Sequence, residues 1–123
     1  MALILFIDDE DLTLELLDQA ARILGHEALT SSTLENGLAL AREKRPDLIV
    51  TDINLAGKNS FSLIKTLSTE KETSHIPVLT LSALDPIEVE EKARENGAAA
   101  SLGKPIRLQT LLEVIREYTA YAK

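Results

Sequence analysis

Short apolar runs alternate along the chain with longer stretches whose apolar residues recur at helical spacing. The short runs predict β-strands over residues 3–7, 27–30, 48–51, 77–81 and 99–102. The longer stretches predict helices over about 11–24, 32–44, 60–69 and 86–96, and a last helix from about residue 108. Strands that alternate with amphipathic helices are typical of βαβ units in a parallel sheet. We therefore expect an α/β protein.

Capping signals mark the ends of the expected helices. Gly25 follows the first helix, where glycine tolerates the backbone conformation of a C-terminal cap. Ser32 and Glu35 have the spacing of a capping box and predict the start of the second helix. Asp85 is the expected N-cap of the fourth helix, because a proline follows it at the first helical position. The loops are short, and we expect one domain over residues 1–123.

The hydrophobicity of the strands also predicts their order in the sheet. Strand 48–51 is apolar on both faces and is expected at the centre, whereas the less apolar strand 27–30 suits an edge. Right-handed crossovers then favour the strand order 2-1-3-4-5. The expected fold is a flavodoxin-like, doubly wound, five-stranded parallel sheet with five helices in three α/β/α layers.

Composition excludes several classes of function. The net charge of −7 and the lack of a basic stripe argue against direct nucleic-acid binding. No apolar run approaches the roughly 20 residues of a membrane span, and no basic region precedes the first apolar run. The chain has no cysteine, which excludes disulfide and thiol chemistry. We expect a cytoplasmic protein that binds neither nucleic acid nor membrane.

Polar residues whose side chains can bind ligands or react follow four of the predicted strands at their carboxyl ends. They are Asp8 with Asp9, then Asp52, Ser82 and Lys104. The carboxyl ends of parallel strands converge on one edge of the sheet, which is where ligands bind in such folds. Three carboxylates, a hydroxyl and an ammonium in one crevice predict a magnesium-dependent phosphoryl site.

Charge repulsion and ligand chemistry favour Mg²⁺ at this edge. Carboxylates about 4 Å apart repel by about 4 kcal/mol at an effective dielectric of 20, so the cluster would either raise the pKa of a carboxylate or recruit a cation. Mg²⁺ prefers one or two carboxylates with water and phosphate oxygens, whereas the spacing of an EF-hand calcium loop and the cysteines of a zinc site are missing. Asp52 is the expected nucleophile, because it ends the central strand and a carboxylate can form an aspartyl phosphate.

Each of these residues also has an ordinary structural interpretation. The acids at 8–11 complement the positive end of the first helix. Lys104 is otherwise a surface lysine, and Ser82 a turn residue. We prefer the phosphoryl site because the four positions occur together.

Four segments resemble the receiver domain of two-component response regulators, of the chemotaxis-receiver type. They are IDDE at 7–10, RPDLIVTDINL at 45–55, IPVLTLSA at 76–83 and GAAASLGKPI at 97–106. The resemblance covers the whole chain, and the four segments together are highly specific. It implies a signalling receiver that is not an enzyme beyond catalysing its own Mg²⁺-dependent phosphorylation and dephosphorylation.

The resemblance also implies a role for each site residue. Asp52 would be the phosphoacceptor. The Mg²⁺ ligands would be Asp9 directly, Asp8 largely through water, the Asp52 carboxylate and the backbone carbonyl of Asn54. Ser82 and Lys104 would hold the phosphoryl oxygens with the backbone N–H of Ala83, and the Lys104–Pro105 peptide bond would be cis.

Partners follow from the same resemblance. The phosphoryl donor would be a sensor histidine kinase or a histidine phosphotransfer protein. A downstream effector would read the face formed by helix 86–96, strand 99–102 and the last helix. The chain would be a monomer or a weak dimer.

Departures from the receiver pattern keep a second interpretation open. Leu55-Ala56 and Ser60 replace the usual Met-Pro and Gly of the loop after Asp52, and Ser101 stands where receivers usually have a switching aromatic residue. These changes favour, as an alternative, a non-switching pseudo-receiver that acts as a protein-interaction module.

Two enzymatic or carrier interpretations on the same topology are weaker. A phosphatase with an aspartyl nucleophile would need a carboxylate at position 54, where the chain has Asn54. A flavin carrier would need a Ser/Thr/Gly-rich loop after the first strand, where the chain has acids. His26 and His75 lie in a predicted loop or strand start, and we assign them no function.

Overall fold

The computed structural model describes residues 1–83 and 86–120, without the side chains of Pro86 and Glu88. Five parallel strands form one sheet in the order β2-β1-β3-β6-β7, which is the predicted order. The strands are β1 (Leu3–Ile7), β2 (Glu27–Ser31), β3 (Leu48–Asp52), β6 (Val78–Ser82) and β7 (Ala100–Gly103). The fully buried β3 lies at the centre, because both of its faces are apolar.

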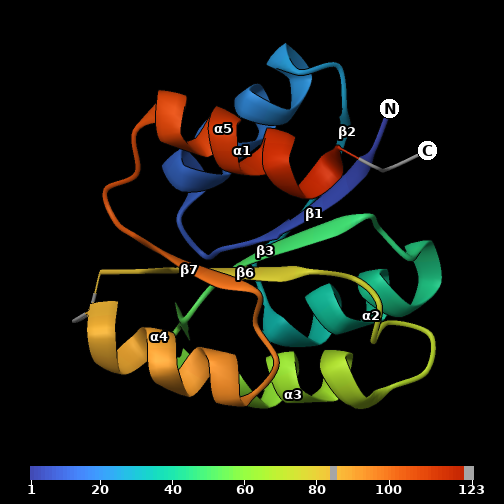
Figure 1. The fold of residues 1–123 in the computed structure, drawn as a ribbon, viewed down its shortest axis with the longest axis vertical. Helices are drawn as coiled ribbons and strands as arrows, with labels where there is room; N and C mark the ends of the chain where they lie inside the picture. The colour runs from blue at the N-terminus through green and yellow to red at the C-terminus, as the bar shows by residue number, and fades with distance from the viewer. Residues whose placement is uncertain (84–85, 121–123) are drawn as a thin grey trace.

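Five helices cover the two faces of the sheet (Figure 1). They are α1 (Asp11–Ile23), α2 (Leu34–Lys44), α3 (Phe61–Thr69), α4 (Pro86–Glu95) and α5 (Leu108–Thr119). Helices α1 and α5 lie on one face, and α2, α3 and α4 lie on the other. The predicted three-layer α/β/α architecture is therefore confirmed.

The core consists of two clusters, one on each side of the sheet. Phe6, Val50 and Leu79 pack against α1 and α5. Leu5 and Ile49 point to the opposite side and belong to the cluster that contains residues of α2, α3 and α4. Successive strand residues point to opposite faces, so the continuous apolar runs of the sequence supply both clusters.

Two local predictions need correction. The N-cap of α2 is Thr33, whose hydroxyl accepts a hydrogen bond from the backbone N–H of Asn36, and not Ser32. Thr33 satisfies a free N–H of the first turn with the same chemistry one residue later. The loop after β3 also contains a short antiparallel hairpin, β4 (Asn54–Leu55) with β5 (Lys58–Asn59), which was not predicted. The expected N-cap Asp85 lies outside the described residues.

The hairpin turns at Ala56 and Gly57, which both have positive φ angles of 51° and 81°. Two successive positive φ angles are typical of the tight turn that matches the twist of paired strands. Glycine tolerates this conformation readily, whereas the side chain of Ala56 makes it costly. The hairpin brings the loop beside the carboxyl ends of β1 and β3. Across the described residues, no helix is long and apolar enough to span a bilayer.

Candidate functional site

The ammonium of Lys104 lies at the centre of a cluster of carboxylates at the carboxyl edge of the sheet. Its Nζ donates to Asp8 Oδ2 at 3.0 Å, to Glu10 Oε1 at 3.0 Å and to Asp52 Oδ2 at 3.1 Å. Lys104 follows β7 directly, and its backbone N–H donates to the carbonyl of Ser82 at 2.8 Å. The end of the neighbouring strand β6 therefore fixes the backbone from which the ammonium reaches the acids.

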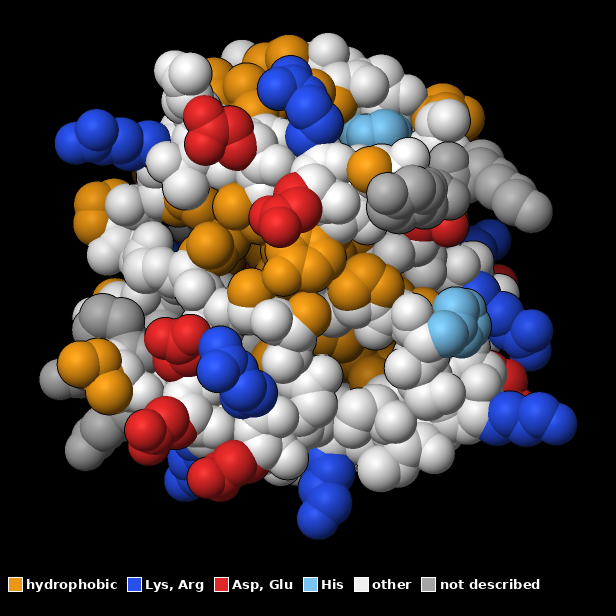
Figure 2. Space-filling model, viewed as in Figure 1, with side chains coloured by type: hydrophobic (Ala, Val, Ile, Leu, Met, Phe, Trp, Pro, Cys, Tyr) orange, Lys and Arg blue, Asp and Glu red, His pale blue; other side chains and the backbone are white. Residues whose placement is uncertain are grey.

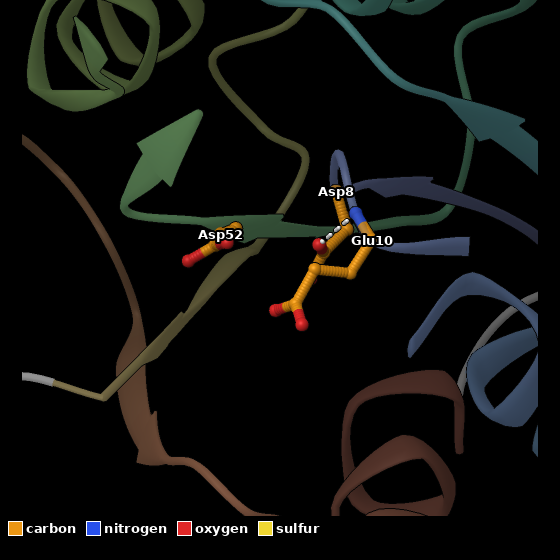
Figure 3. Close-up of side chains that lie close together, drawn as sticks. All are labelled: Asp8, Glu10 and Asp52. Atoms are coloured by element: carbon orange, nitrogen blue, oxygen red, sulfur yellow. Dashed lines mark hydrogen bonds between the residues drawn. The ribbon is translucent and has the colours of Figure 1, made fainter. Parts of the chain in front are cut away.

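Asp8 is the most deeply buried acid of the cluster. It follows β1, its backbone N–H donates to the carbonyl of Ser31 at 3.0 Å, and its side chain is fully buried. Its Oδ1 accepts a hydrogen bond from the backbone N–H of Glu10 at 2.9 Å (Figure 3). A buried carboxylate needs such partners, and Lys104 with the Glu10 backbone supplies them.

Asp52 is the last residue of the central strand β3 and is only 6% exposed. Its Oδ2 accepts from Lys104, and its Oδ1 accepts from the backbone N–H of Asn54 at 3.3 Å. Figure 3 shows its carboxylate reaching into the same space as that of Glu10. The predicted nucleophile is thus held at the centre of the crevice.

Burial and neighbouring charges shift the pKa values of Asp52 and Lys104. Burial raises the pKa of Asp52, and the nearby Asp8 charge raises it further, while Lys104 and the Asn54 N–H act against the rise. Burial alone would lower the pKa of Lys104, but its hydrogen bonds to Asp8, Glu10 and Asp52 outweigh burial and raise it. Lys104 therefore stays a cation, and the formal charges of three carboxylates and one ammonium leave an excess of negative charge in the cluster.

This donor set fits a hard divalent cation. Asp8, Glu10 and Asp52 each offer a carboxylate oxygen, and these oxygens lie within 4.8 Å of one another. Oxygens on opposite sides of a Mg²⁺ ion are about 4.2 Å apart, because each Mg–O bond is about 2.1 Å. At most one pair of the three oxygens can lie on opposite sides of the ion, and the other pairs must come to about 3.0 Å, so the acids would have to move together around it. The ion would offset the excess negative charge.

The structure does not bring Asp9 into this cluster. Asp9 is exposed, and its Oδ2 accepts a hydrogen bond from the backbone N–H of Ala56 at 3.0 Å. Its carboxylate thus links the end of β1 to the β4–β5 hairpin. Asn54, whose carbonyl was the other expected ligand, lies at the start of the same hairpin and is exposed. Their roles as metal ligands stay predictions.

Glu10 is the site residue that the sequence analysis missed. The chain bends at Asp9, and the Glu10 backbone N–H donates to Asp8 Oδ1, so the carboxylates of Asp8 and Glu10 reach the same ammonium. Glu10 has extended backbone angles (φ −96°, ψ 115°) and is the N-cap of α1. In the sequence, nothing in the run of acids at 8–11 distinguishes Glu10 from a residue that complements the helix dipole.

Strand β6 contributes the hydroxyl of Ser82 to the edge of the sheet where the acids lie. Ser82 is the last residue of this strand, is 6% exposed, and pairs in register with Gly103, directly before Lys104. Ala83 follows and is exposed. The Lys104–Pro105 peptide bond is cis, as the resemblance implied.

Ser101, at the position of the usual switching aromatic residue, forms a side-chain hydrogen bond within the sheet. Its Oγ accepts a hydrogen bond from Oγ1 of the fully buried Thr80 on the neighbouring strand, at 2.7 Å. This pair links β6 to β7 through side chains as well as backbone.

Both histidines lie away from the crevice. His26 Nδ1 accepts a hydrogen bond from the backbone N–H of Ala2 at 2.9 Å, and its Nε2 lies 3.3 Å from Thr119 Oγ1. His26 therefore has a structural role that links the chain directly before β1 to α5. His75 is exposed.

Comparisons with known proteins point to one family. Residues 4–116 match the model of the response regulator receiver domain. The polar-differentiation response regulator DivK of Brucella anthropi is 32% identical over 115 residues, which are 94% of each chain.

Solved structures are similar as well. A putative response regulator from Chloroflexus aurantiacus has a TM-score of 0.89 and 28% identity, covering 97% of this chain and 98% of its own. The chemotaxis response regulator CheY4 of Vibrio cholerae has a TM-score of 0.89 and 25% identity, covering 96% and 98%.

Proposed function

Because this chain belongs to the response regulator receiver domain family, we propose that it accepts a phosphoryl group on Asp52. The observation that carries this proposal is the ammonium of Lys104, which lies 3.1 Å from the Asp52 carboxylate and 3.0 Å from that of the buried Asp8. An acid cluster built only to complement a helix terminus needs no such counter-ion at its centre.

In the proposed reaction an oxygen of the Asp52 carboxylate attacks the phosphorus of a phosphohistidine. The P–N bond to the donor breaks as the P–O bond forms, and the donor histidine keeps the electron pair. Positioning and charge neutralisation are the main requirements of phosphoryl transfer. Lys104 contacts a phosphoryl oxygen as a point charge, and the hydroxyl of Ser82 and the N–H of Ala83 donate to the other oxygens.

The chain's acids would hold Mg²⁺ beside this nucleophile. We assign it to the carboxylates of Asp8, Asp9 and Asp52 and the carbonyl of Asn54, as the family resemblance implies. The compact set of Asp8, Glu10 and Asp52 oxygens supports a divalent cation at this edge. When bound, Mg²⁺ supplies neutralisation of the charge that develops on the phosphoryl oxygens.

The signal would leave through the face formed by α4, β7 and α5. Figure 2 shows hydrophobic side chains gathered between α5 and α4, with charged side chains around them. Leu102, Ile106, Leu108 and Leu112 are partly buried hydrophobic residues of β7, the following loop and α5. An apolar centre with a charged rim suits an effector protein. We place the protein in the cytoplasm as a single receiver domain, monomeric or weakly dimeric.

One observation favours a second candidate, the non-switching interaction module. The Thr80–Ser101 hydrogen bond occupies the position from which receivers usually read out phosphorylation with an aromatic ring. A module of this kind would keep the fold and bind partners without phosphorylation. Saturable Mg²⁺ binding that perturbs the surroundings of Asp52 would argue against it, and its absence would favour it.

Intact-protein mass spectrometry tests the proposed function. The chain is incubated with Mg²⁺ and acetyl phosphate, alongside Asp52→Asn and a sample containing a metal chelator. We expect the wild-type chain to gain one phosphoryl group, and neither the variant nor the chelated sample to gain any. Equal gain by the wild type and Asp52→Asn, or gain by neither, contradicts the proposal.

A further inference from the structure

Glu10 holds the same ammonium that the phosphoryl group needs. Its Oε1 accepts from Lys104 Nζ at 3.0 Å, the same distance as that from Nζ to the buried Asp8. The Glu10 side chain is 63% exposed, whereas the other two acids that bind the ammonium, Asp8 and Asp52, have side chains that are 0% and 9% exposed. Glu10 is therefore the one acid of the cluster that lies on the outer side of Lys104.

Glu10 also lines a surface hollow that contains Lys104. It forms the wall of this hollow together with Leu12, Ala83, Lys104 and Pro105. One of its carboxylate oxygens lies within 4.8 Å of an oxygen of Asp52. A phosphodonor that reaches Asp52 past Lys104 therefore comes close to a second negative charge.

We propose that Glu10 is a specificity-determining residue that disfavours small anionic phosphodonors in proportion to their charge. This inference rests on the proposed function, because it concerns transfer to Asp52. Glu10 acts in two ways: it competes with the incoming phosphoryl oxygens for the Lys104 ammonium, and it repels their charge.

The exposure of Glu10 sets the size and the character of the effect. An exposed ion pair contributes roughly 0.2–1 kcal/mol, which corresponds to about a 1.4- to 5-fold change in rate. A contribution from an exposed charge is screened by salt, whereas a contribution from packing is not. The effect must also increase with the charge of the donor.

The experiment measures phosphorylation rates of Glu10→Gln and wild type at Mg²⁺ concentrations that saturate each protein. Acetyl phosphate serves as a dianionic donor and phosphoramidate as a monoanionic one. At low ionic strength we expect Glu10→Gln to react about 2- to 5-fold faster with acetyl phosphate, with a smaller gain for phosphoramidate. High salt should abolish both gains.

Glu15→Gln is the matched control, because it removes an equal charge from an exposed position of the same helix. It should change neither rate. A second readout, independent of turnover, is the binding of beryllofluoride, a phosphoryl analogue, followed by ¹⁹F NMR. Glu10→Gln should bind beryllofluoride more tightly by a similar factor, again in a salt-dependent manner.

Several outcomes would overturn the inference while leaving the proposed function intact. These are equal rates for wild type and Glu10→Gln, a gain that does not depend on salt or donor charge, and an equal gain in Glu15→Gln. A Glu10→Gln protein that fails to fold would also overturn it, since the role of Glu10 would then be structural. Failure of the wild type to be phosphorylated at all contradicts the proposed function instead.

Discussion

Replacing Lys104 by methionine tests how strongly the carboxylate cluster depends on its counter-ion. The change keeps an unbranched side chain of similar length and removes the charge. The Nζ loses two hydrogen bonds to carboxylates that are 0% and 9% exposed, Asp8 and Asp52, and one to the exposed Glu10. Removing one partner of a buried ion pair typically costs 3–5 kcal/mol, and an exposed pair adds less than about 1 kcal/mol.

We therefore expect Lys104→Met to lower the free energy of unfolding by about 3 kcal/mol at neutral pH without metal. For a domain of this size, the melting temperature should fall by roughly 10 °C. Urea denaturation followed by circular dichroism measures the change, with Lys71→Met as a control because Lys71 is exposed. The control should stay within about 0.5 kcal/mol of wild type.

The pH and Mg²⁺ dependence make this prediction specific to charge. Without Lys104, the pKa of Asp52 rises further above its unfolded value, so the variant loses stability as pH rises through that pKa. The deficit should be largest near neutral pH and shrink toward about pH 4. It should also shrink with Mg²⁺, because the ion replaces the missing positive charge. A deficit within about 0.5 kcal/mol of zero in metal-free buffer, or one unaffected by pH and Mg²⁺, would refute the reasoning.

Three further predictions concern single side chains. Asp52→Asn should raise the melting temperature of the metal-free protein at neutral pH, because burial raises the pKa of Asp52 and its ionised form opposes folding; the gain, measured by thermal denaturation, should disappear as pH falls below the unfolded pKa. Burial lowers the pKa of His26, so the contribution of neutral His26 to the free energy of unfolding should be fully present above about pH 6.5 and be lost as pH falls through the lowered pKa. His26→Gln should flatten this pH dependence in urea titrations carried out below about pH 6.5. Thr80→Val removes the donor to Ser101 and should cost about 1 kcal/mol of unfolding free energy, whereas no change would show that the hydroxyl pair contributes nothing to stability.

Much of the fold could be predicted from the sequence because its apolar pattern is consistent. The central place of β3 followed from a run that is apolar on both faces, and the edge place of β2 followed from its weaker hydrophobicity. The β4–β5 hairpin could not be predicted from this pattern. Its strands have two residues each, and Ala56 adopts a positive φ angle that alanine rarely takes.

The candidate site was predictable only in part. The topology explains why Asp8, Asp52 and Lys104 converge, since each lies at or directly after the carboxyl end of a parallel strand. Glu10 was missed because an exposed acid at a helix N-terminus has an ordinary explanation in the helix dipole. The Asp9 contact with the hairpin depends on a loop conformation that the sequence did not indicate.

The most direct test of the central claim is the chemical identification of the phosphorylated residue. The protein is incubated with Mg²⁺ and acetyl phosphate and then treated with borohydride, which reduces an acyl phosphate to an alcohol and leaves free carboxylates intact. Peptide mass spectrometry then locates the reduced residue. The account predicts homoserine at position 52, formed only when Mg²⁺ and the donor are both present. Homoserine at position 8 or 9, or at no position, would contradict it.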